Sequence, residues 1–245
     1  MMSRTDTGEK PPQGDRLDRE EIAADPAARG VVYQTLATAF EHPTEELHAG
    51  LLAGQVKNGM QDALEATALD VSVPEFAPAE SYEELSARYN RLFALGSAVV
   101  TDRTDGSVDK EGPAVSLYES SHRDDATWQT INVDLARAYE HYGLSVDTEE
   151  RDHHDNLGLQ LEFAGYLARR VALGEADAGA ARRDFLDRHL TVFAGSLRDS
   201  LNDTDVAGVY ADLATLLEQF VVADHADLAD RYDGPSSTDR SEVSF

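Results

Sequence analysis

A short run of histidine and carboxylate residues is the first place in this sequence where reactive side chains could gather. Asp152-His153-His154-Asp155 offers two imidazoles and two carboxylates, which are ligand types that divalent metals bind. The same acids, placed just before a helix, would instead cap its free N–H groups and favour its dipole. Adjacent histidines generally point in different directions, and no third ligand follows at helical spacing. We therefore predict no metal site, and keep His153 and His154 as weak candidate ligands.

Catalytic chemistry has little support in the rest of the chain. Glu119 and Glu162 could act as a general acid and base, but nothing in the sequence places them together. The sequence contains no Gly-rich phosphate loop, dinucleotide-binding fingerprint, nucleophile elbow or zinc-protease motif. No cysteine occurs, which excludes disulfides, thiol catalysis and thiolate metal sites. We expect a protein that is not an enzyme and that needs no cofactor.

The elements that would position any site are helical between the two ends of the chain. Val32, Leu36 and Phe40 form an apolar stripe at helical spacing. Pro43 would end that helix, and Thr44 can cap the next one. We find no alternation strong enough to predict a sheet, and no internal repeat. The predicted fold class is all-α, a single globular bundle of about eight to ten helices.

Capping patterns mark two further helices. Ser81-Tyr82-Glu83-Glu84 has the pattern of a capping box, in which the first and last side chains bond to each other's backbone N–H groups. Asp124 or Asp125 can cap a later helix. That helix would run to Tyr142 and end in a turn at Gly143, because glycine tolerates the left-handed backbone of a helix end.

Composition divides the chain into one domain between two tails. Residues 1–24 and 234–245 are polar, and we predict that both are disordered. Residues 25–233 would form the helical domain. A long loop over about 96–123, rich in Gly, Asp, Ser and Thr, interrupts this domain. Loops of this length inside compact domains are usually functional or disordered. The loop is also a possible hinge, so a monomer and a domain-swapped dimer both stay open.

The charge of the chain excludes several classes of partner. The 245 residues carry 47 acids against 21 lysines and arginines, a formal net charge of −26. Such a surface lacks the basic stripe that nucleic acid requires, and an anionic membrane would repel it. No apolar run is long enough to span a membrane, and the N-terminus lacks a secretory signal, so we expect a cytoplasmic protein. Acid excess with only three lysines is typical of proteins that work in concentrated salt, where the charges are screened.

Three segments taken together resemble one protein family. They are Tyr89-Asn90-Arg91-Leu92-Phe93, the segment 112–120 with sequence GPAVSLYES, and the segment 155–163 with sequence DNLGLQLEF. In order and spacing they resemble the TorD/DmsD family of redox-enzyme maturation chaperones, in the NarJ-like superfamily. The resemblance covers about residues 28–225, which is nearly all of the expected domain.

The resemblance implies an all-helical, non-catalytic chaperone with a defined partner. Such proteins bind the twin-arginine signal peptide of a molybdopterin-containing oxidoreductase and hold its catalytic subunit in the cytoplasm until the cofactor is inserted. Typical clients reduce dimethyl sulfoxide, trimethylamine N-oxide or nitrate. Two alternatives stay open: an assembly factor of the nitrate-reductase type that acts on the mature subunit, and a helical protein that binds a metal or a small molecule.

Candidate contacts to the signal peptide lie in the second and third segments. They are Tyr118, Glu119, Asp155, Asn156, Leu159, Glu162 and Tyr166. The spacing i, i+4, i+7, i+11 would put four of them, from Asp155 to Tyr166, on one helix face. Asp155 and Glu162, and with them Glu119, are candidate acceptors for the two arginines, because a guanidinium pairs bidentately with a carboxylate. The motif residues expected to have structural roles are Tyr89, Leu92, Phe93, Pro113, Ser120, Leu157, Leu161 and Phe163.

Two places in these motifs allow more than one interpretation. Tyr118 and Glu119 could line a groove that receives the peptide, or they could anchor the loop and cap a turn. The family usually has Asp-His at the start of the third segment, where this chain has Asp155-Asn156. An alternative register uses Asp152-His153 and needs three extra residues downstream, and His154 could stand in for the missing histidine.

Overall fold

The computed structural model describes residues 2–4, 23–76, 78, 80–94, 98–100, 108–110, 112–146 and 153–233. Helices dominate these residues, which confirms the all-α prediction. The α-helices are α1 (Ala24–Ala39), α2 (Glu45–Leu52), α3 (Gln55–Glu65), α4 (Tyr82–Tyr89), α5 (Trp128–His141), α6 (Leu157–Ala172), α7 (Ala176–Phe185), α8 (Thr191–Asn202) and α9 (Val209–Asp233). The shorter elements are the π-helical turns η2 (Asn90–Ala94) and η4 (Leu186–Leu190), the 3-10 turn η3 (Glu119–Ser121), and the strands β1 (Met2–Arg4), β2 (Ala98–Val100), β3 (Val108–Lys110) and β4 (Leu144–Val146).

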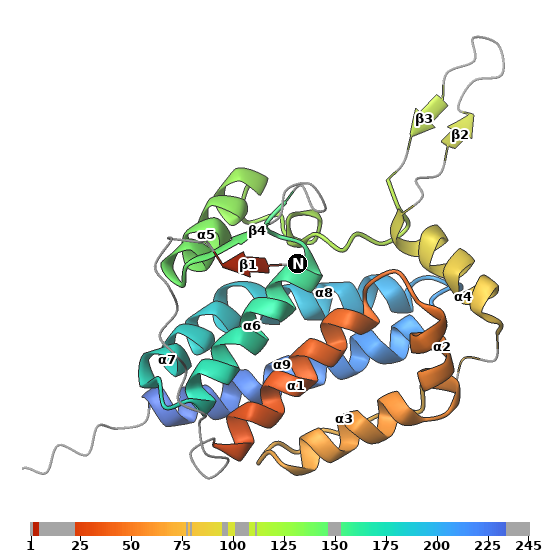
Figure 1. The fold of residues 1–245 in the computed structure, drawn as a ribbon. Helices are drawn as coiled ribbons and strands as arrows, with labels where there is room; N and C mark the ends of the chain where they lie inside the picture. The colour runs from red at the N-terminus through yellow and green to blue at the C-terminus, as the bar shows by residue number, and fades with distance from the viewer. Residues whose placement is uncertain are drawn as a thin grey trace, which may run out of the picture.

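The long helices α1, α6, α8 and α9 form the centre of the bundle (Figure 1). α1 packs along α6, while α9 contacts α1, α7 and α8. α2 and α3 form a pair at one side, where α3 lies against α1. Leu36, Leu161 and Phe220 belong to one continuous core cluster and are fully buried. Among the described residues, no helix combines the length and the apolar character needed to cross a membrane.

Two glycines set the close approach of α1 and α6. A Cβ on Gly30 would lie 3.3 Å from the carbonyl oxygen of Gly165. A Cβ on Gly165 would in turn lie 3.1 Å from the Cβ of Tyr33 and 3.4 Å from the Gly30 oxygen. Larger residues at either position would push the two backbones apart, because protein interiors are close-packed and leave no slack at such a crossing.

A buried carboxylate ties α1, α7 and α9 together beneath this crossing. Asp224 on α9 is fully buried, and its Oδ1 accepts a 2.7 Å hydrogen bond from Arg29 Nη1. Arg182 Nη2 reaches the same oxygen at 3.1 Å, and Tyr33 donates its hydroxyl proton to Oδ2 at 2.6 Å. Burial, together with the charge of Asp224, holds the pKa of Tyr33 well above its usual value. The buried charge is thus surrounded by donors from two other helices, as burial of a carboxylate requires.

Short strands depart from the prediction of a chain without sheets. β1 pairs antiparallel with β4, with Met2 opposite Val146. β1 lies within the N-terminal segment that was expected to be disordered. β2 pairs with β3 inside the expected long loop, Ala98 opposite Lys110. Each strand has three residues, which is too short for alternating polarity to be recognised in a sequence. Ala24, the last residue of the predicted N-terminal tail, already begins α1, and the remaining tail residues 1, 5–22 and 234–245 lie outside the described residues.

Local capping follows the sequence at most of the expected positions. The Thr44 side chain caps α2, Ser81 and Glu84 form the predicted capping box of α4, and Gly143 adopts a φ of 67° after α5. The expected cap of α5 is wrong: Thr127, not Asp124 or Asp125, accepts the hydrogen bond from the first turn. A competing partner explains the difference for Asp125, whose carboxylate is held by the guanidinium of Arg123.

Candidate functional site

A groove opens where α1, α4 and α6 meet the loop that precedes η3. Its volume is about 590 Å³. It is lined by Gln34, Thr38, Phe40, Glu41, His42, Tyr89, Leu117, Asn156, Gly158 and Glu162. The lining combines an aromatic wall, two carboxylates and the first turn of α6, and it draws on four separate stretches of the chain.

One wall forms because the loop pairs with the start of α6. Tyr118 and Asn156 form an isolated antiparallel bridge. On either side of it, the N–H of Leu157 donates to the Leu117 oxygen at 2.8 Å, and the N–H of Glu119 donates to the Asp155 oxygen at 3.0 Å. The Asn156 side chain then caps α6 by accepting from Gly158 N–H at 3.0 Å. The second and third sequence motifs therefore meet in space and build this wall together.

The facing wall is aromatic and is held by hydrogen bonds. The Tyr89 hydroxyl donates to the backbone oxygen of Phe40 at 3.2 Å. The rings of His42 and Tyr89 meet edge to face with centroids 5.1 Å apart, a favoured aromatic arrangement. Tyr89 also contacts Phe93 and Tyr210, which join this wall to the core. Tyr89 thus both packs against the core and lines the groove.

Glu119 supports the groove from behind. Its side chain is fully buried, which separates it from any ligand in the groove. Oε1 accepts from Arg123 Nη1 at 2.8 Å, and Oε2 accepts from Gln160 Nε2 at 2.9 Å. His189 Nδ1 lies 2.9 Å from Oε2, and its other ring nitrogen lies 3.1 Å from Asp134 Oδ2. A single buried carboxylate therefore joins η3 to α6 and η4.

Asp155 is the second carboxylate that the structure places behind the groove. It is fully buried, and its Oδ2 accepts from the N–H of Ser120 at 3.0 Å. Asn132 holds the same segment by accepting from the N–H groups of His154 and Asp155. Asp155 also precedes α6, so the predicted helix face from Asp155 to Tyr166 is wrong at its first member. The carboxylate fixes the η3 turn and does not reach the groove surface.

The remaining candidate residues divide between the groove and the packing around it. Asn156 and Glu162 line the groove. Leu159 is fully buried and has no surface to offer a ligand. Tyr118 contacts the His153 ring, with centroids 5.7 Å apart. Tyr166 lies beside Tyr142 and accepts a hydrogen bond from Arg170 at 2.6 Å, outside the groove lining. What each of these side chains contributes to binding stays a prediction.

The structure places most of the motif residues expected to be structural in or against the core. Leu92, Leu157, Leu161 and Phe163 are buried in the core cluster, and Phe93 packs against it while partly exposed. Pro113 is exposed.

Sequence reasoning missed the contribution of α1. Gln34, Thr38 and Glu41 line the groove, and Phe40 and His42 join them from the end of the same helix. Gln34 and Thr38 have the spacing i, i+4 and mark a polar stripe opposite the apolar one, and Glu41 follows just after the helix ends. That stripe was visible in the sequence, but a polar helix face is the ordinary surface of a globular protein and did not by itself indicate a site.

The two histidines considered as metal ligands point in different directions. The His153 ring lies between those of Tyr118 and Trp128, with centroids 5.7 Å and 5.2 Å away. The His154 ring stacks on Tyr139. Within the residues that the structure describes, no group of three or more His, Asp or Glu side chains is arranged to hold a metal ion, and Asp152 lies outside those residues.

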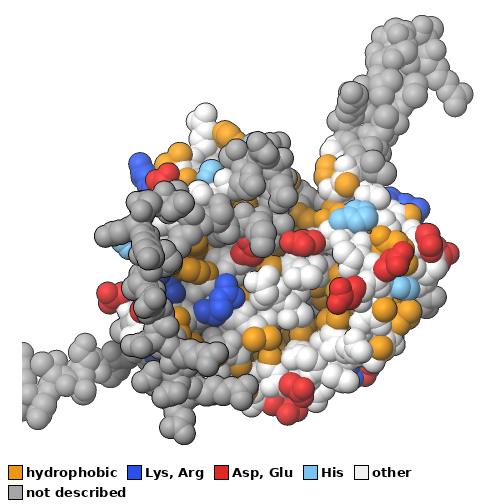
Figure 2. Space-filling view, in the orientation of Figure 1, with side chains coloured by type: hydrophobic (Ala, Val, Ile, Leu, Met, Phe, Trp, Pro, Cys, Tyr) orange, Lys and Arg blue, Asp and Glu red, His pale blue; other side chains and the backbone are white. Residues whose placement is uncertain are grey.

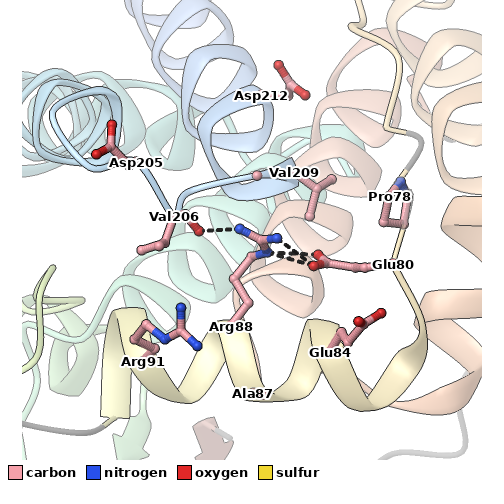
Figure 3. A pocket seen from close by; sticks show the side chains of 11 residues that line it. Pro78, Glu80, Glu84, Ala87, Arg88, Arg91, Asp205, Val206, Val209 and Asp212 are labelled. Carbon is pink, nitrogen blue, oxygen red and sulfur yellow. Dashed lines mark hydrogen bonds and ion pairs between the residues drawn. The ribbon is translucent and has the colours of Figure 1, made fainter.

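A larger hollow lies on the far side of α4, and Arg88 in its lining binds other residues of the protein. It has a volume of about 870 Å³ between α4 and the start of α9. Figure 3 shows Arg88 at its centre, bound to Glu80 and to the backbone oxygen of Val206. Arg88 Nε lies 2.8 Å from Glu80 Oε1, and Nη1 donates to the Val206 oxygen at 2.6 Å. Arg88 thus fastens the α8–α9 connection to α4, which supports the aromatic wall of the groove.

Comparison with known proteins identifies relatives over most of the chain. Residues 36–199 match a family described as nitrate reductase delta subunit. The perchlorate reductase assembly chaperone protein of Dechloromonas aromatica (strain RCB) is 29% identical over 202 residues, which are 80% of this chain and 88% of that protein. The selenate reductase assembly chaperone protein of Thauera selenatis is 28% identical over 212 residues, 84% of this chain and 92% of that protein. None of the solved structures gives a significant match.

Proposed function

Since this chain belongs to the nitrate reductase delta subunit family, we propose that it is an assembly chaperone for the catalytic subunit of a molybdopterin-containing oxidoreductase. Its relatives are named for the assembly of perchlorate and selenate reductases and not for a reaction of their own. The chain is accordingly a non-enzymatic partner of that subunit. In this proposal it acts in the cytoplasm, binds the twin-arginine leader, and keeps the subunit from export until its cofactor is in place.

The observation that carries the leader proposal is the pairing of carboxylates with an aromatic wall in one groove. Glu41 and Glu162 lie among the lining residues with Phe40 and Tyr89. A leader with two arginines followed by an apolar stretch needs acceptors beside a hydrophobic surface. Carboxylates select guanidinium by bidentate geometry, while aromatic faces attract both cations and aliphatic groups. Glu162 stays a proposed acceptor, and Glu41 takes the place of Glu119 and Asp155, which are buried.

Apolar contacts supply most of the affinity in this proposal, and the carboxylates supply discrimination. The chain's charge of −26 suits concentrated salt, where the Debye length is about 3 Å at 1 M and attraction at a distance is screened. Burial of apolar surface contributes roughly 25 cal/mol per Å² and is not screened. Replacing both arginines of the leader by lysine should therefore weaken binding modestly. Replacing its leucines by aspartate should abolish it.

Calorimetric titration in high salt tests the proposal directly. The probes are synthetic twin-arginine leaders of molybdopterin oxidoreductases from the same genome, with the lysine and aspartate versions just described. For Glu162→Gln we expect about tenfold weaker binding of the arginine leader, about 1.4 kcal/mol, and a smaller loss for the lysine version. Glu65→Gln, an exposed change on α3, is the matched control and should leave the affinity unchanged.

Other outcomes would redirect the proposal. If no leader binds the folded protein but the apo catalytic subunit does, the chain is an assembly factor that acts on the mature subunit. If elemental analysis after purification without affinity metals finds stoichiometric metal, the result favours the alternative that the chain is a metal-binding protein. Equal tolerance of the lysine and aspartate leaders would contradict the division of roles between carboxylates and apolar contacts.

A further inference from the structure

A second hollow adjoins the groove on the other side of α1. It has a volume of about 480 Å³ and lies between α1, α2 and the start of α3, and we call it the α2–α3 hollow. Gln34 and Thr38 line both hollows, so the two meet over the exposed side of α1. The other residues of the α2–α3 hollow are Thr35, Thr44, Glu46, Leu47, Gly50, Gln55 and Val56. One bound segment could therefore occupy both without leaving the surface.

The α2–α3 hollow carries little charge for so acidic a chain. Glu46 is the single charged residue in its lining. From Val31 to Phe40, α1 has no charged residue, although Val31 is 52% exposed. Figure 2 shows a stretch of uncharged and hydrophobic atoms across the middle of this face, where Figure 1 places α1, with carboxylates and basic side chains around it. The groove, by contrast, holds Glu41 and Glu162.

We propose that the partner's segment extends beyond the groove, crosses α1 at Gln34 and Thr38, and places an uncharged stretch in the α2–α3 hollow. This inference rests on the proposed function and adds a second compartment with different chemistry. The occupant is one continuous stretch of the partner polypeptide, with arginines at one end and small, hydroxyl-bearing and aliphatic residues at the other.

Charge complementarity and lining chemistry determine that order. A cationic end is matched by the carboxylates of the groove and finds one exposed counter-charge, Glu46, in the α2–α3 hollow. Burying an unpaired charge costs far more than burying a neutral group. Leu47 and Val56 offer aliphatic surface there, while Thr35 and Gln55 offer hydrogen-bonding groups. The hollow therefore favours neutral residues. A partner segment that is long enough to reach it should bind this chain more tightly than a shorter one.

Paired titrations of protein variants and peptide lengths test this inference. The probes are the leader that binds the wild-type chain best and the same leader shortened from its far end, which keeps the arginine pair and the apolar residues that contact the aromatic wall of the groove. Gln55→Glu adds a charge to the α2–α3 hollow at the first residue of α3, where a carboxylate favours the helix dipole. Its matched control is Gln129→Glu, also an exposed glutamine in the first turn of a helix, but on α5.

A second variant fills the hollow without adding charge. A Cβ on Gly50 would lie 3.5 Å from Val56 Cγ2 and 3.8 Å from Gln55 Oε1, which are ordinary contacts. The Cβ of Gly50→Leu therefore strikes no backbone, and the substitution adds uncharged side-chain volume at the lining of the hollow. We expect Gln55→Glu and Gly50→Leu each to weaken binding of the full leader about tenfold and to leave binding of the truncated leader unchanged. Both variants should keep the helical spectrum and a melting temperature no lower than that of the wild type, since replacing a helical glycine favours the helix. Gln129→Glu should bind both leaders as the wild type does.

The outcomes separate this inference from the proposed function. If the wild type binds the leader but both variants bind the full leader normally, or weaken both lengths equally, the second compartment is overturned and the proposed function stands. If the folded wild type binds neither length, the proposed function fails, and the inference falls with it.

Discussion

Glu119, which is buried, and His122, which is half-buried, hold the rim of the groove. His122 Nε2 lies 2.8 Å from the Ser116 oxygen, and Nδ1 lies 3.0 Å from the hydroxyl of Ser196 on α8. A neutral imidazole satisfies both contacts, donating through Nε2 and accepting through Nδ1. Glu119 holds the neighbouring turn through Arg123, so the loop is fastened at two points that a ligand does not touch.

The half-buried imidazole of His122 predicts a pH dependence of stability. Burial lowers the pKa of His122 below its ordinary 6.5, and the hydrogen bond with Ser116 opposes this only in part. Burial lowers the pKa of His154 in the same direction. As pH falls through 6.5 the unfolded chain takes up protons that the folded chain resists, so these histidines stabilise the fold fully above 6.5 and progressively less below it.

Chemical unfolding in high salt between about pH 7 and pH 5, above the range in which most carboxylates titrate, measures this slope. We expect the free energy of unfolding to fall with pH in the wild type, by at most about 1.4 kcal/mol per pH unit for each histidine. The slope should be smaller in His122→Asn. His141→Asn, which removes an exposed imidazole, is the control. An identical slope in His122→Asn and the wild type would contradict the prediction.

At the scale of elements, local signals were reliable where one residue had one available partner. Thr44 and Ser81 cap as the sequence predicted. Asp125 does not, because Arg123 binds its carboxylate and leaves Thr127 to start α5. Asp155 likewise bonds to the N–H of Ser120, and α6 begins two residues later. Long-range contacts decide which partner such a side chain binds, and the spacing of residues along one helix gives no information about those contacts.

A glycine-to-alanine change should have opposite effects on stability at the α1–α6 crossing and on the more open surface of α8. Gly165→Ala puts a Cβ 3.1 Å from Tyr33 Cβ, so we expect a loss of about 1–3 kcal/mol from overpacking. Gly195→Ala on α8 meets only Glu218 Oε1 at 3.8 Å, and should gain up to about 1 kcal/mol from helix propensity. Urea unfolding of both variants measures the difference. A stabilised Gly165→Ala would show that the crossing has room that the structure does not indicate.

At the scale of the whole molecule, the sequence predicted the all-α class and the motif segments more completely than the site. The groove combines residues 34–42 of α1 and its end with Tyr89, Leu117 and residues 156–162. The second and third motifs were recognised in sequence and do meet at the groove wall. The part of the lining that residues 34–42 contribute and the burial of Glu119 both depend on how distant segments pack. The periodicity of a single segment does not predict that packing.

The net charge of −26 leads to a prediction about salt. Raising the ionic strength from about 0.01 M to 1 M shortens the Debye length from about 30 Å to 3 Å and screens repulsion among surface carboxylates. We therefore expect the melting temperature to rise steeply with KCl, and less with sucrose, which strengthens burial without screening. A melting temperature that falls with added KCl would contradict the proposal that the chain works in concentrated salt.

The contact between Trp128 and His153 also gives the molecule its own optical reporter. Trp128 is the sole tryptophan, it is 47% exposed, and its ring meets the imidazole that touches Tyr118. All indole emission therefore originates next to the segment that pairs with α6 at the groove wall. A shift in its wavelength or quenching on addition of a peptide would follow binding in real time, on unlabelled protein and at any salt concentration.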